Sequence, residues 1–403
     1  MNAPGTSAPD TSAEQRLEID VAYLRAQLQA LLDIPSPTGF TDTVVRHVCG
    51  ELEAIGVEFE LTRLGAIRAR LPGAQSEGAR ACVAHLDTLG AQVRALKDNG
   101  RLALVPVGHW SARFAEGARA TVLAEDALWR GTILPPLASG HTFGDAVDAA
   151  PVGWDHVEMR VDAQVRDKAD LAQLGIEVGD HVAIDPQPEF LDNGYVVSRH
   201  LDDKAGVAAM LAALRALVAS GRTPPVDCWW IFTIAEEVGH GAAGAMLPDI
   251  ASLVAVDNGT AAPGQNSSEF GVTIAMADQT GPFDYHLTRK LVELCRAHDI
   301  DHRKDVFRYY RSDSASALEA GADIRTALVT FGVDASHGYE RTNMHALRSL
   351  AELLSVYVLG PVHIPRDAKP VSDLAGFTRQ AAPVVVHDVG RFEPGEAEDP
   401  TPQ

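Results

Sequence analysis

Residues 226–239, VDCWWIFTIAEEVG, contain an apolar run that ends abruptly in two adjacent glutamates. The run over residues 228–235 has the length and the β-branched and aromatic content of a buried strand. Carboxylates at the end of a buried strand are costly unless a cation offsets their charge. Neighbouring side chains cannot point the same way, so one of Glu236 and Glu237 can bind a metal ion while the other carries a proton. Taken alone, the pair is more simply interpreted as solvated residues that open a helix.

An α/β pattern surrounds this stretch. Apolar residues at helical spacing predict helices, and short apolar runs predict strands. The expected helices cover residues 20–33, 41–55, 200–217, 283–298, 313–321 and 343–359, and the expected strands cover residues 80–84, 252–256 and 325–331, with a β-hairpin over residues 57–71. Such alternation is typical of a sheet covered by helices, so the sequence predicts the α/β class.

Residues 92–195 have a different character. They contain many short β-like runs broken by Gly, Pro and Asp, with one short helix expected over residues 169–174. This pattern predicts an inserted, mostly β domain. The sequence therefore divides into a disordered leader rich in Pro, Ser and Thr, a main domain formed by two segments, the insertion and a tail: residues 1–15, residues 16–91 with 196–364, residues 92–195 and residues 365–403.

Composition limits the classes of function. The chain of 403 residues is long enough for two cores. Its formal net charge of -21 argues against nucleic acid or an anionic membrane as a partner. The four cysteines include no CxxC pair, so neither a thiolate zinc site nor a disulfide framework is predicted. The start of the chain does not read as a signal peptide and no apolar run reaches membrane-spanning length, so the cytoplasm is the expected compartment.

Histidine and carboxylate residues share one placement in this pattern. Each follows an apolar strand-like run or stands where a helix begins: His85 with Asp87, Glu236 with Glu237, Asp257, His337 and, at the helix start, Asp202. In open α/β sheets, ligands bind beyond the carboxyl ends of the strands, so these segments can converge on one crevice. Imidazole and carboxylate donors without thiolate suit zinc, cobalt or manganese, and this set is large enough for two ions that share a carboxylate.

Each piece has a simpler explanation when it is taken alone. A histidine at a strand end is more often a satisfied core residue. Asp202 at a helix start is ordinarily a cap, and Asp257 before Asn-Gly is ordinarily part of a turn. The order of the pieces, after strands of a single α/β layer, makes coincidence improbable.

These motifs resemble a family of metallopeptidases. The segments HLD (85–87), DDKAG (202–206), AEEVG (235–239) and VDNG (256–259), with the late His337, are similar to the tetrahedral aminopeptidases and glutamyl aminopeptidases, some of which are labelled endoglucanases. The resemblance covers about residues 20–360, including the long separation between the first two motifs. It implies a three-layer α/β/α metallopeptidase catalytic domain with an inserted, barrel-like β domain.

The resemblance also implies residue roles and two divalent metal ions, zinc first, with cobalt or manganese as alternatives. Asp202 would bridge the two ions, with His85 and Asp257 completing one and Glu237 and His337 the other. Two further residues are expected to be catalytic. Glu236 would be the general base, and Asp87 would accept the second imidazole N–H of His85.

Some residues depart from the family pattern. Lys204 stands where the family commonly has Arg, and the final motif reads SHGYER over residues 336–341. This motif resembles that of a branch of the family found with gene clusters for the osmoprotectant N-acetylglutaminylglutamine amide. His345 is a nearby rival to His337 as a ligand, although it falls in a predicted helix. Arg308 and Arg311 lie in a loop before the last strand, where they are either substrate-binding residues or part of a solvated basic loop.

The sequence thus predicts a metalloaminopeptidase that hydrolyses the N-terminal bond of a peptide. One alternative is an amidohydrolase that acts on a small dipeptide amide or an acylated amino acid. A second is a metal-free relative that serves as a scaffold or binding module, which the complete ligand set argues against. The resemblance further implies a homo-oligomer, from a dimer up to a dodecamer, assembled through the inserted domain, where it would cover apolar residues such as Trp110 and Phe114.

Overall fold

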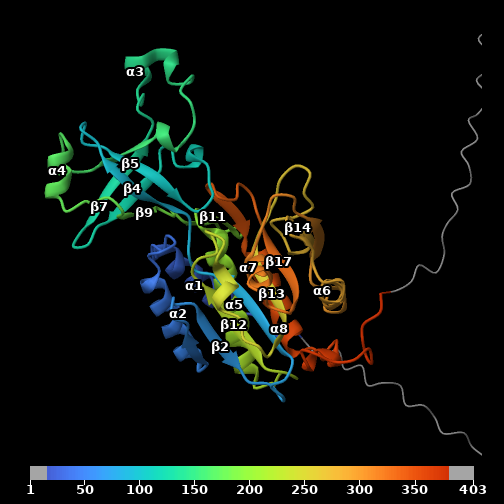
Figure 1. The fold of residues 1–403 in the computed structure, drawn as a ribbon. Helices are drawn as coiled ribbons and strands as arrows, with labels where there is room; N and C mark the ends of the chain where they lie inside the picture. Colours follow the sequence, from blue (N-terminus) through green and yellow to red (C-terminus); the bar gives the residue numbers. More distant parts are fainter. Residues whose placement is uncertain (1–15, 381–403) are drawn as a thin grey trace, which may run out of the picture.

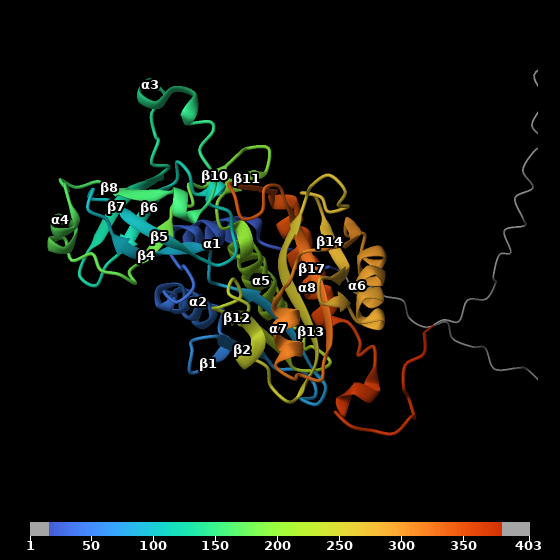
Figure 2. The ribbon, with the colours of Figure 1, turned by 45° about the horizontal axis from the view of Figure 1, so that its top comes forward.

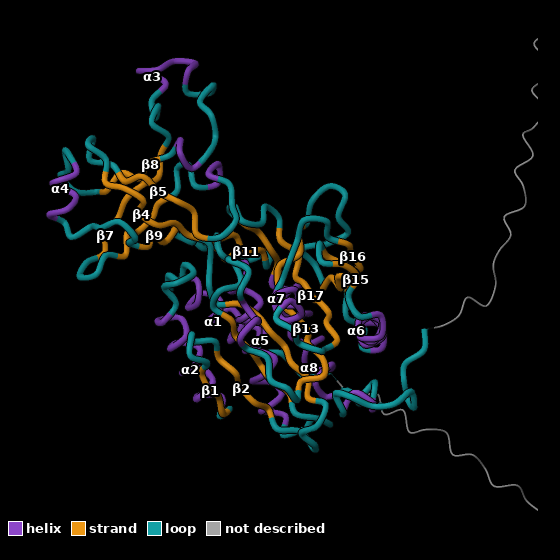
Figure 3. Tube along the Cα trace, viewed as in Figure 1, coloured by secondary structure: helices purple, strands orange, loops and turns teal. Residues whose placement is uncertain are grey.

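A computed structural model describes residues 16–380 of the chain. A large mixed sheet lies among helices, and a closed barrel of strands stands beside it (Figures 1 and 2). Figure 3 shows the barrel strands gathered at one end of the molecule and those of the large sheet nearer its centre. The sequence prediction of an α/β fold with an inserted barrel-like part is confirmed.

The elements of the described chain have the following bounds. The helices are α1 (Val21–Asp33), α2 (Asp42–Ile55), α3 (Gly140–Phe143), α4 (Lys168–Gln173), α5 (Leu201–Ser220), α6 (Tyr285–Ala297), α7 (Asp313–Glu319) and α8 (Met344–Leu359), with 3-10 turns η1 (Ala112–Phe114), η2 (Gly144–Ala146), η3 (Trp154–His156), η4 (Gly241–Gly244) and η5 (Pro365–Ala368). The large sheet contains β1 (Glu58–Leu61), β2 (Ile67–Leu71), β3 (Ala79–His85), β12 (Cys228–Thr233), β13 (Ile250–Thr260), β14 (Val272–Asp278), β15 (Gly281–Pro282), β16 (His302–Val306) and β17 (Arg325–Val333). The barrel contains β4 (Gly90–Leu96), β5 (Leu102–Val107), β6 (Arg119–Leu123), β7 (Leu128–Leu134), β8 (Glu158–Val161) and β9 (His181–Ile184), and a small sheet contains β10 (Glu189–Phe190), β11 (Tyr195–Ser198) and β18 (Glu340–Asn343).

The large sheet has four parallel strands at its centre. Its order is β1-β2-β12-β3-β13-β17-β14-β15, with β16 beside β14. The pairs β12–β3, β3–β13 and β13–β17 are parallel, and β2 and β14 flank them antiparallel. The predicted strand over residues 228–235 is confirmed as β12. Because parallel strands end at a common edge, the residues that follow β3, β12 and β13 are brought together there.

Both faces of this sheet are covered, and alternate residues of each central strand face opposite layers. Trp230 and Phe232 of β12 belong to the core under α1, α2, α5, α6 and α8, whereas Ile231 belongs to the core under α7 and η4. The middle helix of the thicker layer is α5, which is buried on all sides over residues 201–214. This burial fixes the start of α5 against the carboxyl ends of the strands.

The barrel has its own core. Its strands follow the order β4-β5-β8-β7-β6-β9, and β9 pairs with β4 to close it. The interior is filled by side chains such as Leu102, Val122, Met159 and Val182, all 0% exposed. A small barrel packed in this way is a solid module and contains no channel. In Figure 1 the connection that carries α3 projects from it.

A three-stranded sheet links the barrel to the main sheet. The chain leaves the barrel through β10 and β11, and β11 pairs antiparallel with β18, so that Ser198 lies opposite Glu340. The loop that carries His337 joins β17 to β18. The pairing of β11 with β18, where the chain leaves the barrel, therefore positions the loop that carries His337.

Most predicted elements are confirmed within a few residues of their ends, including the hairpin β1–β2. The strands β14, β16 and β18 were not predicted. The segment of β18, ERTN, is polar and is a strand because β11 pairs with it, which periodicity cannot show. The predicted leader and the part of the tail after residue 380 lie outside the described residues. Among the helices of residues 16–380, none is long and apolar enough to cross a membrane.

Candidate metal centre

Three parallel strands and one helix start supply the predicted ligands. His85 is the last residue of β3, Asp257 lies near the end of β13, and Glu236 and Glu237 come three and four residues after β12. Asp202 is at the start of α5, where the residue is 5% exposed. The structure brings all of these residues to the same edge of the sheet.

Asp202 stands between two groups of donors. In the first, His85, Asp202 and Asp257 have donor atoms within 4.8 Å of one another, and His85 Nε2 is 3.1 Å from Asp202 Oδ1. In the second, Asp202, Glu237 and His337 meet the same limit, and His337 Nε2 is 3.3 Å from Asp202 Oδ2. Each oxygen of the Asp202 carboxylate therefore faces one group, which is the arrangement that a bridging ligand requires.

Main-chain carbonyls orient both imidazoles. His85 Nδ1 is 2.9 Å from the carbonyl oxygen of Asp87, and His337 Nδ1 is 3.0 Å from that of His109. A carbonyl can only accept, so Nδ1 carries a proton in each ring, and Nε2, which faces Asp202, can bind a metal ion once it has lost its own proton. The His109 carbonyl comes from the segment after β5, so the inserted part contributes to this orientation.

The carboxylate of Asp87 has a different task from the predicted one. Its Oδ1 is 3.7 Å from His85 Nδ1, farther than the carbonyl of the same residue. It accepts the backbone N–H groups of Glu236 at 3.1 Å and Glu237 at 3.3 Å, and the Thr38 hydroxyl at 2.6 Å. Asp87 therefore holds the loop that carries the two glutamates.

The two glutamates point to different places. Glu237 Oε2 is 3.9 Å from His337 Nε2 and belongs to the second donor group, with 4% of its side chain exposed. Glu236 belongs to neither group; its Oε2 is 3.9 Å from His85 Nε2, and 16% of its side chain is exposed. Both line an open cavity of about 660 Å³. The separation of roles expected for neighbouring residues is compatible with this geometry.

Several supporting residues escaped the sequence analysis. Buried Glu340 accepts the backbone N–H groups of Asp202 at 3.2 Å and His337 at 2.9 Å. His337 has a φ of 64°, which is uncommon for a residue other than glycine, and this contact helps to hold it. Asn258 donates to Asp202 Oδ2 at 2.6 Å. Glu340 lies three residues after His337 in a polar segment, and only its burial marks it as special.

Other candidate residues lie apart from the donors. His345 accepts the backbone N–H of Gly271 at its Nδ1 and belongs to neither donor group. Arg311 lines the cavity and its guanidinium binds Glu319 at 2.6 Å, whereas Arg308 is exposed and is not among the lining residues. The cavity is also lined by Tyr310, whose buried hydroxyl interacts with the carboxylate of Asp257.

Burial acts strongly on the charges of this centre. It raises the pKa values of Glu236, Glu237 and Asp257 well above the usual range of a carboxyl group, and neighbouring carboxylates raise them further. Burial opposes charge on Asp202 as well, but hydrogen bonds from His337 and His85 keep its pKa below the usual value. Against the effect of burial, the hydrogen bond to Asp202 and the charge of Glu237 raise the pKa of His337 to about 10.

These side chains fit divalent metal ions. Asp203 Oδ1 and Glu237 Oε1 are buried without a hydrogen-bond partner in the described residues, and the surrounding carboxylates outnumber the two imidazoles. Negative charge buried in this way needs cations to offset it. Imidazole nitrogen and carboxylate oxygen, with no thiolate among the donors, are ligands that zinc, cobalt and manganese accept.

Comparison with known proteins agrees with this geometry. The sequence profile described as M42 glutamyl aminopeptidase matches residues 65–353. The chain belongs to this family. M42 peptidases are metal-dependent hydrolases of peptide bonds, so the chain is a peptidase. Its M42 relatives include the protein named "Putative aminopeptidase YhfE" of Bacillus subtilis, which is 36% identical over 83% of this chain and 97% of its own length.

Solved structures of M42-like peptidases share the fold. The aminopeptidase APDkam598 from the archaeon Desulfurococcus kamchatkensis has a TM-score of 0.77 at 21% identity, over 88% of this chain and 99% of that one. The Pyrococcus horikoshii TET1 peptidase has a TM-score of 0.74 at 20% identity, over 84% of this chain and 100% of that one. It is described as able to assemble into a tetrahedron or a large octahedral shell.

Glu340→Ala is expected to weaken metal binding. The change removes the acceptor of the Asp202 and His337 backbone N–H groups, so two ligands lose their fixed positions. Groups that orient metal ligands typically contribute about 10- to 100-fold to affinity. Competition titration of zinc against a chelator measures the loss, with Glu177→Ala, at an exposed position of the inserted part, as the matched control. Equal affinities in the two variants would contradict a positioning role for Glu340.

Proposed function

We propose that this chain is an aminopeptidase that uses two divalent metal ions to hydrolyse the first peptide bond of its substrate. One observation carries the proposal: two groups of donors share Asp202 on the wall of an open cavity, and Glu236 stands beside them as a carboxylate outside both groups. His85 and Asp257 would bind one ion, and Glu237 and His337 the other. The donor set favours zinc, with cobalt and manganese as alternatives.

The chain's own residues would move the proton and position the substrate. Metal ions held by these residues would polarise the scissile carbonyl and lower the pKa of the attacking water. Glu236 would take the proton of that water and return it to the leaving amine. Tyr310 lines the cavity, and its hydroxyl would donate to a substrate oxygen. The surplus of carboxylates in the cavity would attract a positively charged amino terminus.

Substitution of the two glutamates tests the assignment of their roles. Glu237→Gln should lose metal, because a neutral amide is a poor ligand. Glu236→Gln should keep metal and the fold but hydrolyse peptides about 10²- to 10⁴-fold more slowly, the usual range for general acid–base assistance. Elemental analysis and single-turnover rates on both proteins give the result.

Three outcomes of that experiment are informative. Loss of metal in Glu236→Gln with retention in Glu237→Gln reverses the assignment. Full activity in both variants removes the proposed metal-dependent mechanism. Substrate binding by the slow Glu236→Gln variant, measured by equilibrium titration, separates a catalytic defect from a folding defect.

We propose that Arg311 binds acidic or amide side chains of the substrate. It lines the cavity, and its contact with Glu319 shows that its guanidinium can bind a carboxylate there. Arg311→Met should reduce the preference for Glu over Leu substrates by about tenfold, the value of one charge-assisted contact. Arg308→Met is the matched control, since Arg308 lies in the same loop but outside the cavity. Equal changes in kcat/KM for both substrates exclude Arg311 from specificity.

We also propose that residues 92–195 form an assembly domain and that the chain is a homo-oligomer. The Pyrococcus horikoshii TET1 peptidase is described as able to assemble into a tetrahedron or a large octahedral shell. The inserted part here exposes apolar side chains, including Leu128 at 67% and Phe143 at 41%. Trp110, expected to be covered by assembly, already packs against Trp154. Light scattering at micromolar concentration should give a mass above the 43.0 kDa of one chain, and a monomer contradicts this proposal.

A further inference from the structure

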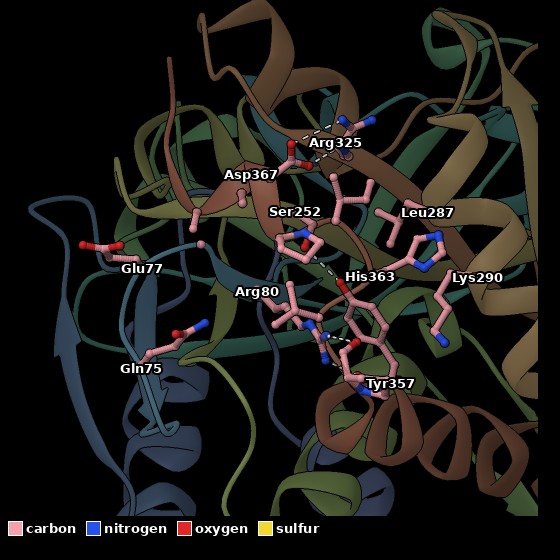
Figure 4. A pocket seen from close by; sticks show the side chains of 17 residues that line it. Gln75, Glu77, Arg80, Ser252, Leu287, Lys290, Arg325, Tyr357, His363 and Asp367 are labelled. Atoms are coloured by element: carbon pink, nitrogen blue, oxygen red, sulfur yellow. Dashed lines mark hydrogen bonds and ion pairs between the residues drawn. The ribbon is translucent and has the colours of Figure 1, made fainter. Parts of the chain in front are cut away.

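A second cavity lies at the opposite edge of the large sheet. It has a volume of about 280 Å³, and its floor is formed by Arg80, Ser252 and Arg325, near the amino-terminal ends of β3, β13 and β17 (Figure 4). A strand rises about 3.3 Å per residue, so Ser252 and Asp257 of β13 are roughly 16 Å apart. This cavity, called the basal pocket below, is therefore separate from the metal centre.

One side of the basal pocket is apolar and held in place. Leu287 of α6 and the ring of Tyr357 at the end of α8 face it (Figure 4). Pro361 and Ile364 of the segment after α8 also line it. Tyr357 is 4% exposed; its hydroxyl is 3.0 Å from Ser252 Oγ, and the Arg80 guanidinium lies 5.0 Å from the centre of its ring. These contacts hold the aromatic wall in one orientation.

The segment over residues 361–368 closes the pocket from outside. Arg80 Nη2 donates to the carbonyl of Pro361 at 2.7 Å, and Arg325 binds Asp367 at 2.5 Å. Gly78 fits closely under this segment, since a Cβ at that position would lie 3.0 Å from the Cα of Ala368. The wall is thus anchored at both of its ends.

A lysine and a histidine lie beside this apolar surface. Lys290 of α6 and His363 are next to each other (Figure 4), and burial and the charge of Lys290 lower the pKa of His363. No ion pair or hydrogen bond of the Lys290 ammonium group occurs within residues 16–380. Arg80 is fixed by main-chain carbonyls at the end of α8, which orient its charge without a carboxylate to neutralise it. The lining carboxylates are Asp367, which binds Arg325, and the exposed Glu77.

This arrangement is unusual for a chain whose net charge is -21. Cations gathered around a cavity raise the local concentration of anions. An apolar wall beside a cation favours a ligand that has an anionic end and a hydrocarbon body. The lysine is a compact charge on a flexible stem, which suits a single carboxylate.

We propose that the basal pocket binds a small carboxylate with an apolar body of about the size of benzoate. The carboxylate would lie between Lys290 and His363, and the apolar body against Leu287 and Tyr357. The site is independent of the proposed peptidase function, because none of these side chains belongs to the metal centre.

Benzoate and its neutral analogue benzamide test the proposal on the full metal-loaded chain. Calorimetric titration should detect benzoate with a Kd on the order of 1 mM, the range open to a ligand of this size, and should find benzamide at least about tenfold weaker. Lys290→Met, which keeps an apolar stem and removes the charge, should weaken benzoate binding by about tenfold or more. Lys304→Met is the matched control, since Lys304 is an exposed lysine on β16, outside the pocket.

The variants also separate this site from the metal centre, where a carboxylate can bind an ion. If benzoate binds at the metal ions instead, Lys290→Met and Lys304→Met will bind it with equal affinity. This result overturns the proposal. Equal binding of benzoate and benzamide, or no binding of benzoate at 10 mM, a concentration about ten times the expected Kd, overturns it as well. If Lys290→Met hydrolyses peptides at the same rate as the unsubstituted chain, the variant is folded.

Discussion

The structure depends on negative charge that is buried at one edge of a parallel sheet. Asp202, Asp257 and Glu237 meet there, and within residues 16–380 the donor groups that they form contain His85 and His337 as partners of opposite sign. Carboxylates brought this close inside a protein repel one another and lose their hydration. The fold can hold them together because the surrounding scaffold is large and rigid, and because metal ions supply the missing positive charge in this family.

The scaffold fixes these residues through backbone contacts. Asp87 accepts the N–H groups of the two glutamates, and Glu340 accepts those of Asp202 and His337. The barrel also takes part, since the carbonyl of His109 orients the His337 ring and β11 pairs with the strand that carries Glu340. The inserted part and the main sheet are therefore coupled at the site, so its geometry depends on how the two are joined.

The two ends of the central strands carry different side chains. Strands β3 and β13 carry metal-ligand candidates at one end, and they carry Arg80 and Ser252 at the other. The basal pocket proposed above would therefore attract its ligand at a place separate from the metal centre. One set of strands thus provides the floor of both cavities.

The sequence alone determined the α/β class, a mostly β insertion and the candidate ligands. Apolar periodicity locates buried strands, and side chains that follow parallel strands must meet at one edge, so His85, Asp257 and the pair Glu236–Glu237 could be named without coordinates. The resemblance to the family, and not periodicity, implied a barrel and selected Glu237 of that pair as the ligand. Only the tertiary structure decided the roles of Asp87 and Glu340, because their partners are N–H groups of residues distant in the sequence. The polar strand β18 and the basal pocket also depend on packing between distant segments. Periodicity records the burial of each segment, but it carries no information about which segments become neighbours.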